Sequence, residues 1–213
     1  MEEALPIATA TKSPASDAQP APLPHLSVAE REARGKAARA EVPRSAHANF
    51  EPVGTRDDPV ALLERQAATR VPELVPIRYG RMLVSPFTFY RGAAMIMSHD
   101  LSATPRSGLT VQCCGDAHLS NFGVFASPER RLMFDVNDFD ETLPGPWEWD
   151  VKRLATSMLI AAIDNGFNVK AQEKAVLDTV NEYRTSIRQF ASMNNLEVWY
   201  ARLDMEDVLA KYG

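Results

Sequence analysis

The sequence lacks several features that define whole classes of protein. It has only two cysteines, the adjacent Cys113 and Cys114, which excludes a disulfide framework and lacks the spacing of a zinc site. The longest nearly apolar run, residues 154–163, is too short to cross a bilayer. Acidic residues outnumber basic ones by 28 to 23, so the basic footprint of a nucleic-acid-binding protein is absent. We therefore expect no membrane and no nucleic acid among the partners.

The first residues also lack the basic region and the apolar region of a signal peptide. Together with the low cysteine content, this predicts a cytoplasmic location. What remains is a chain of 213 residues, 45% hydrophobic and 24% charged, which is ordinary for a soluble globular protein. Such a chain can bury a core without disulfide or metal staples.

Composition divides the chain into two parts. Residues 1–45 are interpreted as a disordered tail rich in alanine and proline, followed by a short charged helix over residues 28–42. Residues 46–213 are interpreted as one folded domain. No internal repeat is visible.

Local patterns predict helices on both sides of a central group of strands. Asp58 and Pro59 form a helix start, and that helix should end before Val71. Irregular structure is expected over residues 78–90. The other expected helices cover residues 93–101, 147–163, 169–190 and 196–209, with Gly166 and Asn168 between the second and third of these. The expected strands are residues 109–113 and a hairpin of 121–125 with 131–135. This order predicts an α+β fold.

The segment GDAHLSN, residues 115–121, follows the first expected strand. In phosphoryl transfer, an Asp accepts the proton of the substrate hydroxyl and an Asn further along the same loop binds Mg²⁺. Asp116 and Asn121 have that spacing. By itself the pattern is weak, because a loop Asp often only caps the backbone nearby.

The acidic segment, residues 135–150, strengthens this interpretation. It follows the expected hairpin, as the second metal ligand of kinases does. It holds six carboxylates and no basic residue, namely Asp135, Asp138, Asp140, Glu141, Glu148 and Asp150. Such oxygen ligands suit Mg²⁺ or Mn²⁺. Asp138 is the favoured ligand, with Asp135 as the alternative and Asp140 as a further candidate; the alternative to a metal site is a solvated acidic turn.

These segments carry a resemblance to a known family. GDAHLSNFGVF and LMFDVNDFDE resemble the catalytic pattern of aminoglycoside and choline phosphotransferases, within the protein-kinase-like superfamily. A wider stretch, residues 43–165, is similar to the bacterial family called domain of unknown function 2252. The similarity also rests on the motifs RxDPVxLLExQ, SPFTFYRGAA and FDVNDFDETLPGPWEWDVKRLA within this stretch. The resemblance implies the C-lobe of a kinase-like fold, with catalytic loop, β-hairpin and helical end.

The resemblance also implies roles for individual residues. Asp116 would be the catalytic base, Asn121 and Asp138 the metal ligands, and ATP with Mg²⁺ or Mn²⁺ the co-substrate. His118 and Asp150 would support the loop and tie the following helix to it. Independently of the resemblance, Arg78, Arg81 and Arg91 precede the loop in the sequence. They would either clamp phosphate or support the site by pairing with residues 135–141. The two cysteines, Trp147 and Trp149 are interpreted as core residues.

One departure from the kinase pattern is plain. No glycine-rich loop and no strand lysine precede Asp116, although a kinase needs both to hold the phosphates. In the resembled family these elements are expected after the helical part, as in a circular permutation. We therefore expect an incomplete C-lobe, truncated at its C-terminus and inactive alone, whose partners are a nucleotide, an acceptor of unassigned chemistry and the missing C-terminal half.

Two other functions compete with the phosphotransferase. A two-metal phosphoesterase would use Asp116 and His118 as its first ligands, but it predicts further GDxxD and GNH segments that are absent. A non-catalytic, pseudokinase-like binding module fits the missing phosphate-binding elements. It predicts exposed apolar stripes on the helices at 169–190 and 196–209.

Overall fold

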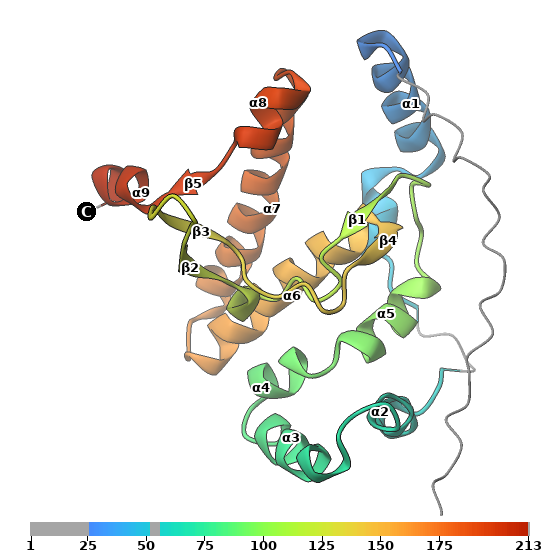
Figure 1. Cartoon of the computed structure of the whole chain (residues 1–213). Coiled ribbons are helices and arrows are strands. Elements are labelled where there is room, and N and C mark those ends of the chain that lie inside the picture. The colour runs from blue at the N-terminus through green and yellow to red at the C-terminus, as the bar shows by residue number, and fades with distance from the viewer. Residues whose placement is uncertain (1–25, 52–55, 213) are drawn as a thin grey trace, which may run out of the picture. The chain divides into compact units, whose positions relative to one another are not determined.

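The computed structural model describes residues 26–51 and 56–212. It confirms the α+β fold, in which helices precede and follow the strands of two small antiparallel sheets along the chain (Figure 1). Contacts divide the chain into two units, Met1–Lys36 and Ala37–Gly213. The predicted tail over residues 1–25 lies outside the described residues. The domain boundary at residue 45 and the cytoplasmic location stay predictions.

Helix α1 (Val28–Glu41) is the charged helix that the composition predicts. Its start is a capping box, because the backbone N–H of Glu30 donates to Ser27 Oγ (3.3 Å) and that of Ser27 donates to the Glu30 carboxylate (2.7 Å). No helix in the described parts of the chain is both long and apolar enough to span a membrane.

Short helices lead up to the first strand, and one prediction about them is wrong. They are η1 (Arg44–Ala48), α2 (Pro59–Ala67), η2 (Pro72–Leu74), α3 (Val75–Met82), α4 (Pro86–Arg91) and α5 (Ala94–Ser102). As predicted, Asp58 caps α2 by accepting from the N–H of Ala61 (3.0 Å). Residues 78–90 are not irregular but mostly helical. The irregularity is expected around Ser85-Pro86, but Ser85 caps α4 and Pro86 stands in its first turn, where the missing N–H costs no hydrogen bond.

Two antiparallel sheets occupy the middle of the chain. In the first, β1 (Thr110–Cys113) pairs with β4 (Leu143–Pro146). In the second, the order is β2 (Phe122–Ala126), β3 (Leu132–Val136), β5 (Leu203–Asp204). The predicted hairpin is therefore confirmed. The sequence did not predict β4, because Leu-Pro-Gly-Pro contains no strong β-formers.

Two long helices follow, as predicted. They are α6 (Trp147–Asp164) and α7 (Val169–Ala191). Gly166 has a φ of +70° between them, and Asn168 caps α7 by accepting from the N–H of Ala171 (3.0 Å). The two helices pack on each other, with Trp147 stacked on Tyr183 at 6.0 Å between ring centres.

The single helix predicted over residues 196–209 is wrong. The chain instead forms α8 (Asn195–Tyr200), the short strand β5 and α9 (Met205–Tyr212). The break occurs at Asp204, a buried carboxylate that Arg131 and Arg202 bind at 2.9 and 3.2 Å. Because Arg131 belongs to the β2–β3 hairpin region, this pairing holds residues 203–204 against β3.

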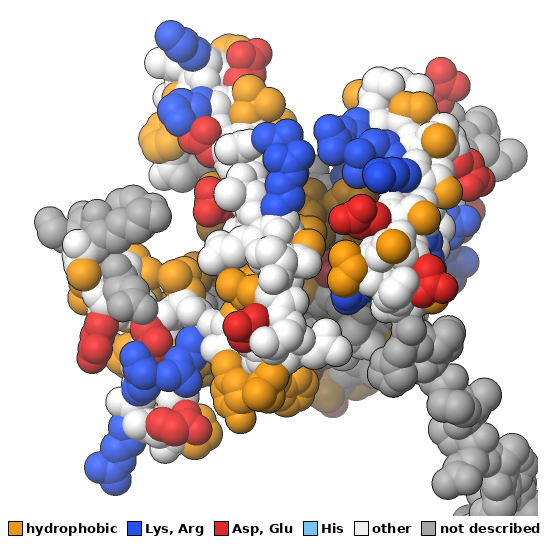
Figure 2. Space-filling model, turned by 90° about the horizontal axis from the view of Figure 1, so that it is seen from above, with side chains coloured by type: hydrophobic (Ala, Val, Ile, Leu, Met, Phe, Trp, Pro, Cys, Tyr) orange, Lys and Arg blue, Asp and Glu red, His pale blue; other side chains and the backbone are white. Residues whose placement is uncertain are grey.

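Much apolar surface stays uncovered around α7 and the second sheet. None of the residues of α7, all of which are described, is buried. On one face of the sheet Val124 pairs with Phe134, and Phe134 with Leu203, and all three are exposed. Figure 2 shows hydrophobic side chains at the surface between charged ones. The exposed apolar stripe predicted for a binding module is present on α7, where it includes Leu177 and Ile187.

Candidate functional site

The segment that connects β1 to β2, residues 114–121, is fastened to α6. The carboxylate of Asp150, in the first turn of α6, accepts hydrogen bonds from the backbone N–H groups of Cys114 (2.7 Å) and Gly115 (3.0 Å). Gly115 has a φ of +85°, a conformation that favours glycine. The start of the segment is thus fixed by one carboxylate and one glycine.

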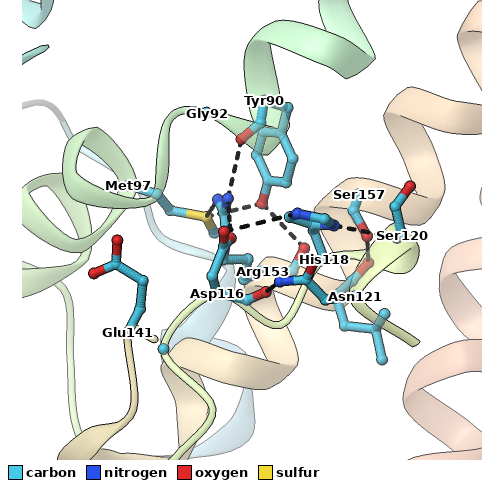
Figure 3. A network of polar contacts seen from close by, with 12 residues as sticks. Tyr90, Gly92, Met97, Asp116, His118, Ser120, Asn121, Glu141, Arg153 and Ser157 are labelled. Carbon is cyan, nitrogen blue, oxygen red and sulfur yellow. Dashed lines mark hydrogen bonds and ion pairs between the residues drawn. The ribbon is translucent and has the colours of Figure 1, made fainter. Parts of the chain in front are cut away.

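Ser157 fastens the far end of the same segment. This side chain of α6 is fully buried. Its Oγ accepts from the N–H of Leu119 (2.9 Å) and donates to the carbonyl of Leu154 (2.7 Å). Within the segment, Nδ2 of Asn121 donates to the carbonyl of Asp116 (2.8 Å). The two residues predicted as base and metal ligand are therefore joined directly, as Figure 3 shows.

The centre of the site is an ion pair between Asp116 and Arg153. Nε and Nη2 of Arg153 both bind Oδ1 of Asp116. Only 2% of Arg153 is exposed. Its guanidinium also lies 4.5 Å from the centre of the Tyr90 ring, and Nη2 donates to the Tyr90 carbonyl (3.0 Å). These contacts fix the position of the Asp116 carboxylate (Figure 3).

His118 lies on the other side of the Asp116 carboxylate. Its Nδ1 accepts from the N–H of Ser120 (3.1 Å), so the proton of the neutral ring is on Nε2. That atom lies 3.7 Å from Oδ2 of Asp116. Burial, with help from the charges of Arg153 and Arg91, lowers the pKa of His118 below its ordinary value of 6.5, although Asp116 opposes this. His118 is therefore a neutral side chain that shapes the loop.

The acidic segment is attached to this loop through its backbone. The N–H of Asn137 donates to the carbonyl of Asn121 (2.8 Å). Asp138 directly follows Asn137 in the chain, so this hydrogen bond holds the backbone of Asp138 near Asn121. Oδ1 of Asp138 accepts from the N–H of Asp140 (3.1 Å). All three predicted acidic ligands are exposed, namely Asp135, Asp138 and Asp140.

The two cysteine thiols lie among the carboxylates that surround the loop. Burial and, after it, four carboxylates raise the pKa of the Cys114 thiol to about 11. In order of effect these are Asp150, Asp116, Asp138 and Asp135. Burial likewise raises the pKa of the Cys113 thiol to about 11. Both thiols stay protonated near neutral pH, which fits core residues and not nucleophiles.

The side-chain oxygens of the loop and of the acidic segment are donors for a hard cation such as Mg²⁺. Among the described residues, no three His, Cys, Asp or Glu side chains form a metal-binding group. Mg²⁺ needs no such group, because it usually keeps several waters and binds one or two carboxylates together with substrate phosphates. The Asn121 amide oxygen and the Asp138 carboxylate are oxygen donors of the kind that Mg²⁺ prefers.

The basic residues near the site make several different contacts. Arg78 donates from Nη2 to the Gly92 carbonyl (2.7 Å). Arg91 is exposed, and its charge reaches His118. In the described part of the chain, the ion pair of the acidic segment over residues 135–141 is made by Arg70, to Glu141 at 3.8 Å. No ion pair among the described residues joins Arg78, Arg81 or Arg91 to residues 135–141. Burial lowers the pKa of Arg78, however, and the nearby charge of Glu141 opposes this, so the predicted pairing stays a prediction.

The sequence allows two interpretations of Lys152 and Arg153, a pairing with the acidic segment or ordinary charges on the helix surface, and neither predicts the pairing of Arg153 with Asp116. A signal for it exists in the spacing. Asp150, Arg153 and Ser157 stand at positions i, i+3 and i+7 of α6, which places them on one face of the helix. A polar face of this kind on a largely apolar helix indicates a buried polar partner, and here that partner is the loop that carries Asp116.

The comparisons with known proteins agree with part of this picture. The family model described as "Uncharacterized protein conserved in bacteria (DUF2252)" matches residues 70–212, which include the loop, the acidic segment and α6. Comparison with curated proteins and with solved structures gives no match.

Proposed function

Because the chain belongs to this family of uncharacterized bacterial proteins, DUF2252, we propose its function from the site: a kinase-like phosphotransferase that uses Mg-ATP. The observation that carries the proposal is the bond from Asn121 Nδ2 to the Asp116 carbonyl (2.8 Å), beside a buried arginine that binds the Asp116 carboxylate. Kinases place their catalytic base and a metal ligand on one loop in this way.

Each residue would have a distinct part in the reaction. The Asp116 carboxylate would accept the proton of an acceptor hydroxyl, while Arg153 holds the carboxylate in one orientation. Asn121 and Asp138 would hold the cation, with Asp135 as the alternative to Asp138. When bound, Mg²⁺ supplies neutralisation of the charge on the transferred phosphoryl group. His118, Asp150 and Ser157 keep the loop in its shape.

A non-catalytic binding module is the second candidate. The exposed apolar residues of α7 and of the second sheet favour it, because monomers rarely leave large contiguous apolar surface uncovered. The same surface could receive the phosphate-binding half of a kinase-like fold. The absence of a glycine-rich loop and lysine before Asp116 is consistent with either interpretation.

Replacing Asp138 by asparagine tests the proposal. We expect D138N to lower the affinity for Mg-ATP about tenfold or more, since one charged ligand of the cation is lost. Isothermal titration of Mg-ATP into the whole chain measures this change. D178N, which changes an exposed carboxylate of α7, is the matched control and should bind as the wild type does.

D116N separates the two candidate functions. It should keep Mg-ATP binding within about threefold of the wild type, and it should lose the phosphoryl transfer that the wild type shows together with the missing C-terminal half, because the base is replaced by an amide. If the wild type binds no Mg-ATP, or if D138N binds it as tightly as D178N, the phosphotransferase proposal fails and the binding module is the better account.

A further inference from the structure

A second candidate site lies between α4, α5 and the middle of α6. There a cavity of about 530 Å³ is bounded by these helices and by the residues that follow η1. Most of its wall is apolar, formed by Phe50, Phe89, Ala93, Ile96, Leu101 and Ala155. Small-molecule sites have volumes of about 300–1,000 Å³ and mostly apolar walls with a few polar groups. The cavity has the size and lining of such a site.

Its wall carries one positive charge without an opposite partner. Lys152, on α6, lines the cavity together with Thr104, to whose Oγ1 it donates a hydrogen bond from Nζ (3.4 Å). Lys152 makes no ion pair with any carboxylate of the described residues. Burial lowers the pKa of Lys152, and the charge of Glu148 opposes this only in part. An anion in the cavity would replace the hydration that the ammonium has lost.

The carboxylate on the same wall is already neutralised. Asp100 accepts hydrogen bonds from Nε and Nη2 of Arg56 at 2.6 and 2.8 Å. A bidentate arginine–carboxylate pair is among the strongest ion pairs in proteins. The negative charge of Asp100 is therefore taken up by Arg56 and does not neutralise the charge of Lys152. Of the two charged residues in the wall, Asp100 is thus paired with Arg56, which lies outside the wall, and the ammonium of Lys152 is the charge left to bind a ligand.

We propose that this cavity binds a small amphipathic carboxylic acid. Its carboxylate would lie on Lys152 Nζ, and its apolar chain or ring would lie against Phe50, Phe89 and Ile96. One lysine matches the single charge of a carboxylate and leaves the second charge of a phosphate monoester unpaired. The proposal does not depend on the phosphotransferase function.

The cavity adjoins the Asp116 site without sharing its loop. Tyr90 and Met97 line the cavity, and both also contact Arg153. The Tyr90 hydroxyl donates to the Arg153 carbonyl (3.0 Å), and Nη1 of Arg153 donates to Met97 Sδ (3.7 Å). An acid in the cavity would therefore contact two residues that hold the partner of Asp116.

Octanoate and 1-octanol, which share an apolar chain and differ in charge, test the proposal by isothermal titration. We expect the whole chain to bind one octanoate saturably. K152M, which keeps an apolar stem, should weaken octanoate binding at least tenfold and change octanol binding less than twofold. K174M, which changes an exposed lysine of α7, is the matched control and should bind octanoate as the wild type does.

A155F, which fills the cavity, should abolish the binding of both compounds. The proposal is overturned if the wild type shows no saturable octanoate binding or if K152M and K174M bind octanoate equally. It is also overturned if folded A155F binds as the wild type does, because the compounds would then occupy apolar surface elsewhere. If A155F does not fold, the comparison of K152M with K174M decides.

Discussion

Replacing Arg153 by methionine is expected to lower the free energy of unfolding by about 3 kcal/mol or more. Arg153 is almost completely buried, and its partner Asp116 has only 19% of its side chain exposed. Removal of the guanidinium leaves that carboxylate without a counter-charge in a place where water reaches it poorly. The Tyr90 carbonyl loses a donor as well. Urea denaturation of the whole chain measures the change.

Two companion variants distinguish the buried pair from a general effect of charge removal. K174M breaks an exposed pair on α7, whose side chains are 71% and 64% exposed, and should cost less than about 0.5 kcal/mol. In the double variant R153M/D116N the uncompensated charge is absent, so its loss should be smaller than the sum of the single losses by about 1–3 kcal/mol. If R153M and K174M lose the same stability, the pair has no special role.

Replacing Gly115 by alanine is expected to cost about 3 kcal/mol or more, for two reasons that add. The φ of +85° strains any residue with a Cβ, which costs about 1–2 kcal/mol. The new Cβ would also lie 1.9 Å from the backbone oxygen of Glu141. Because that atom belongs to the backbone, the acidic segment and the loop must move apart. Thermal or urea unfolding shows the loss.

Alanine substitutions at two other glycines distinguish the cost of the positive φ from the cost of the contact with Glu141. Gly108 has a φ of +74° and open space around the position of a Cβ, so G108A should cost about 1–2 kcal/mol, from strain alone. Gly80, inside α3, has open space and ordinary helical backbone, so G80A should stabilise the protein by about 0.5–1 kcal/mol. Equal losses for G115A and G108A would contradict the close approach of Glu141 to the loop.

The elements that the sequence predicted are those with a local physical cause. Asp58 and Asn168 cap helices with their own side chains, and Gly166 has the positive φ that suits a helix end. The hairpin consists of two neighbouring runs of β-formers. In each case the residues that decide the structure lie within a few positions of it.

What the sequence did not predict depends on contacts between distant residues. Strand β5 exists because two residues pair with β3 and because Arg131 reaches Asp204, 73 positions away. Strand β4 owes its conformation to β1 in the same way. A helical period over residues 196–209 carries no information about such partners.

In the candidate site, too, the local pattern was visible in the sequence and the distant contact was not. The spacing of Asp116 and Asn121 predicted that they act together, and a direct hydrogen bond joins the two residues. Arg153 lies 37 positions from Asp116, and a lysine or arginine on a helix is most often a solvated charge. Only the polar face of α6, considered as a whole, indicates that Arg153 points inward.

The nucleotide-dependent binding of Mn²⁺ tests the central proposal most directly. Mn²⁺ replaces Mg²⁺ at oxygen sites, and its unpaired electrons broaden the NMR signals of nearby backbone amides. With ATP present, we predict that the amides of residues 116–121 and of Asp138 lose their signals while those of α7 stay sharp. Unchanged signals at residues 116–121, or broadening that centres on α7, would contradict a metal–nucleotide site at Asp116, Asn121 and Asp138.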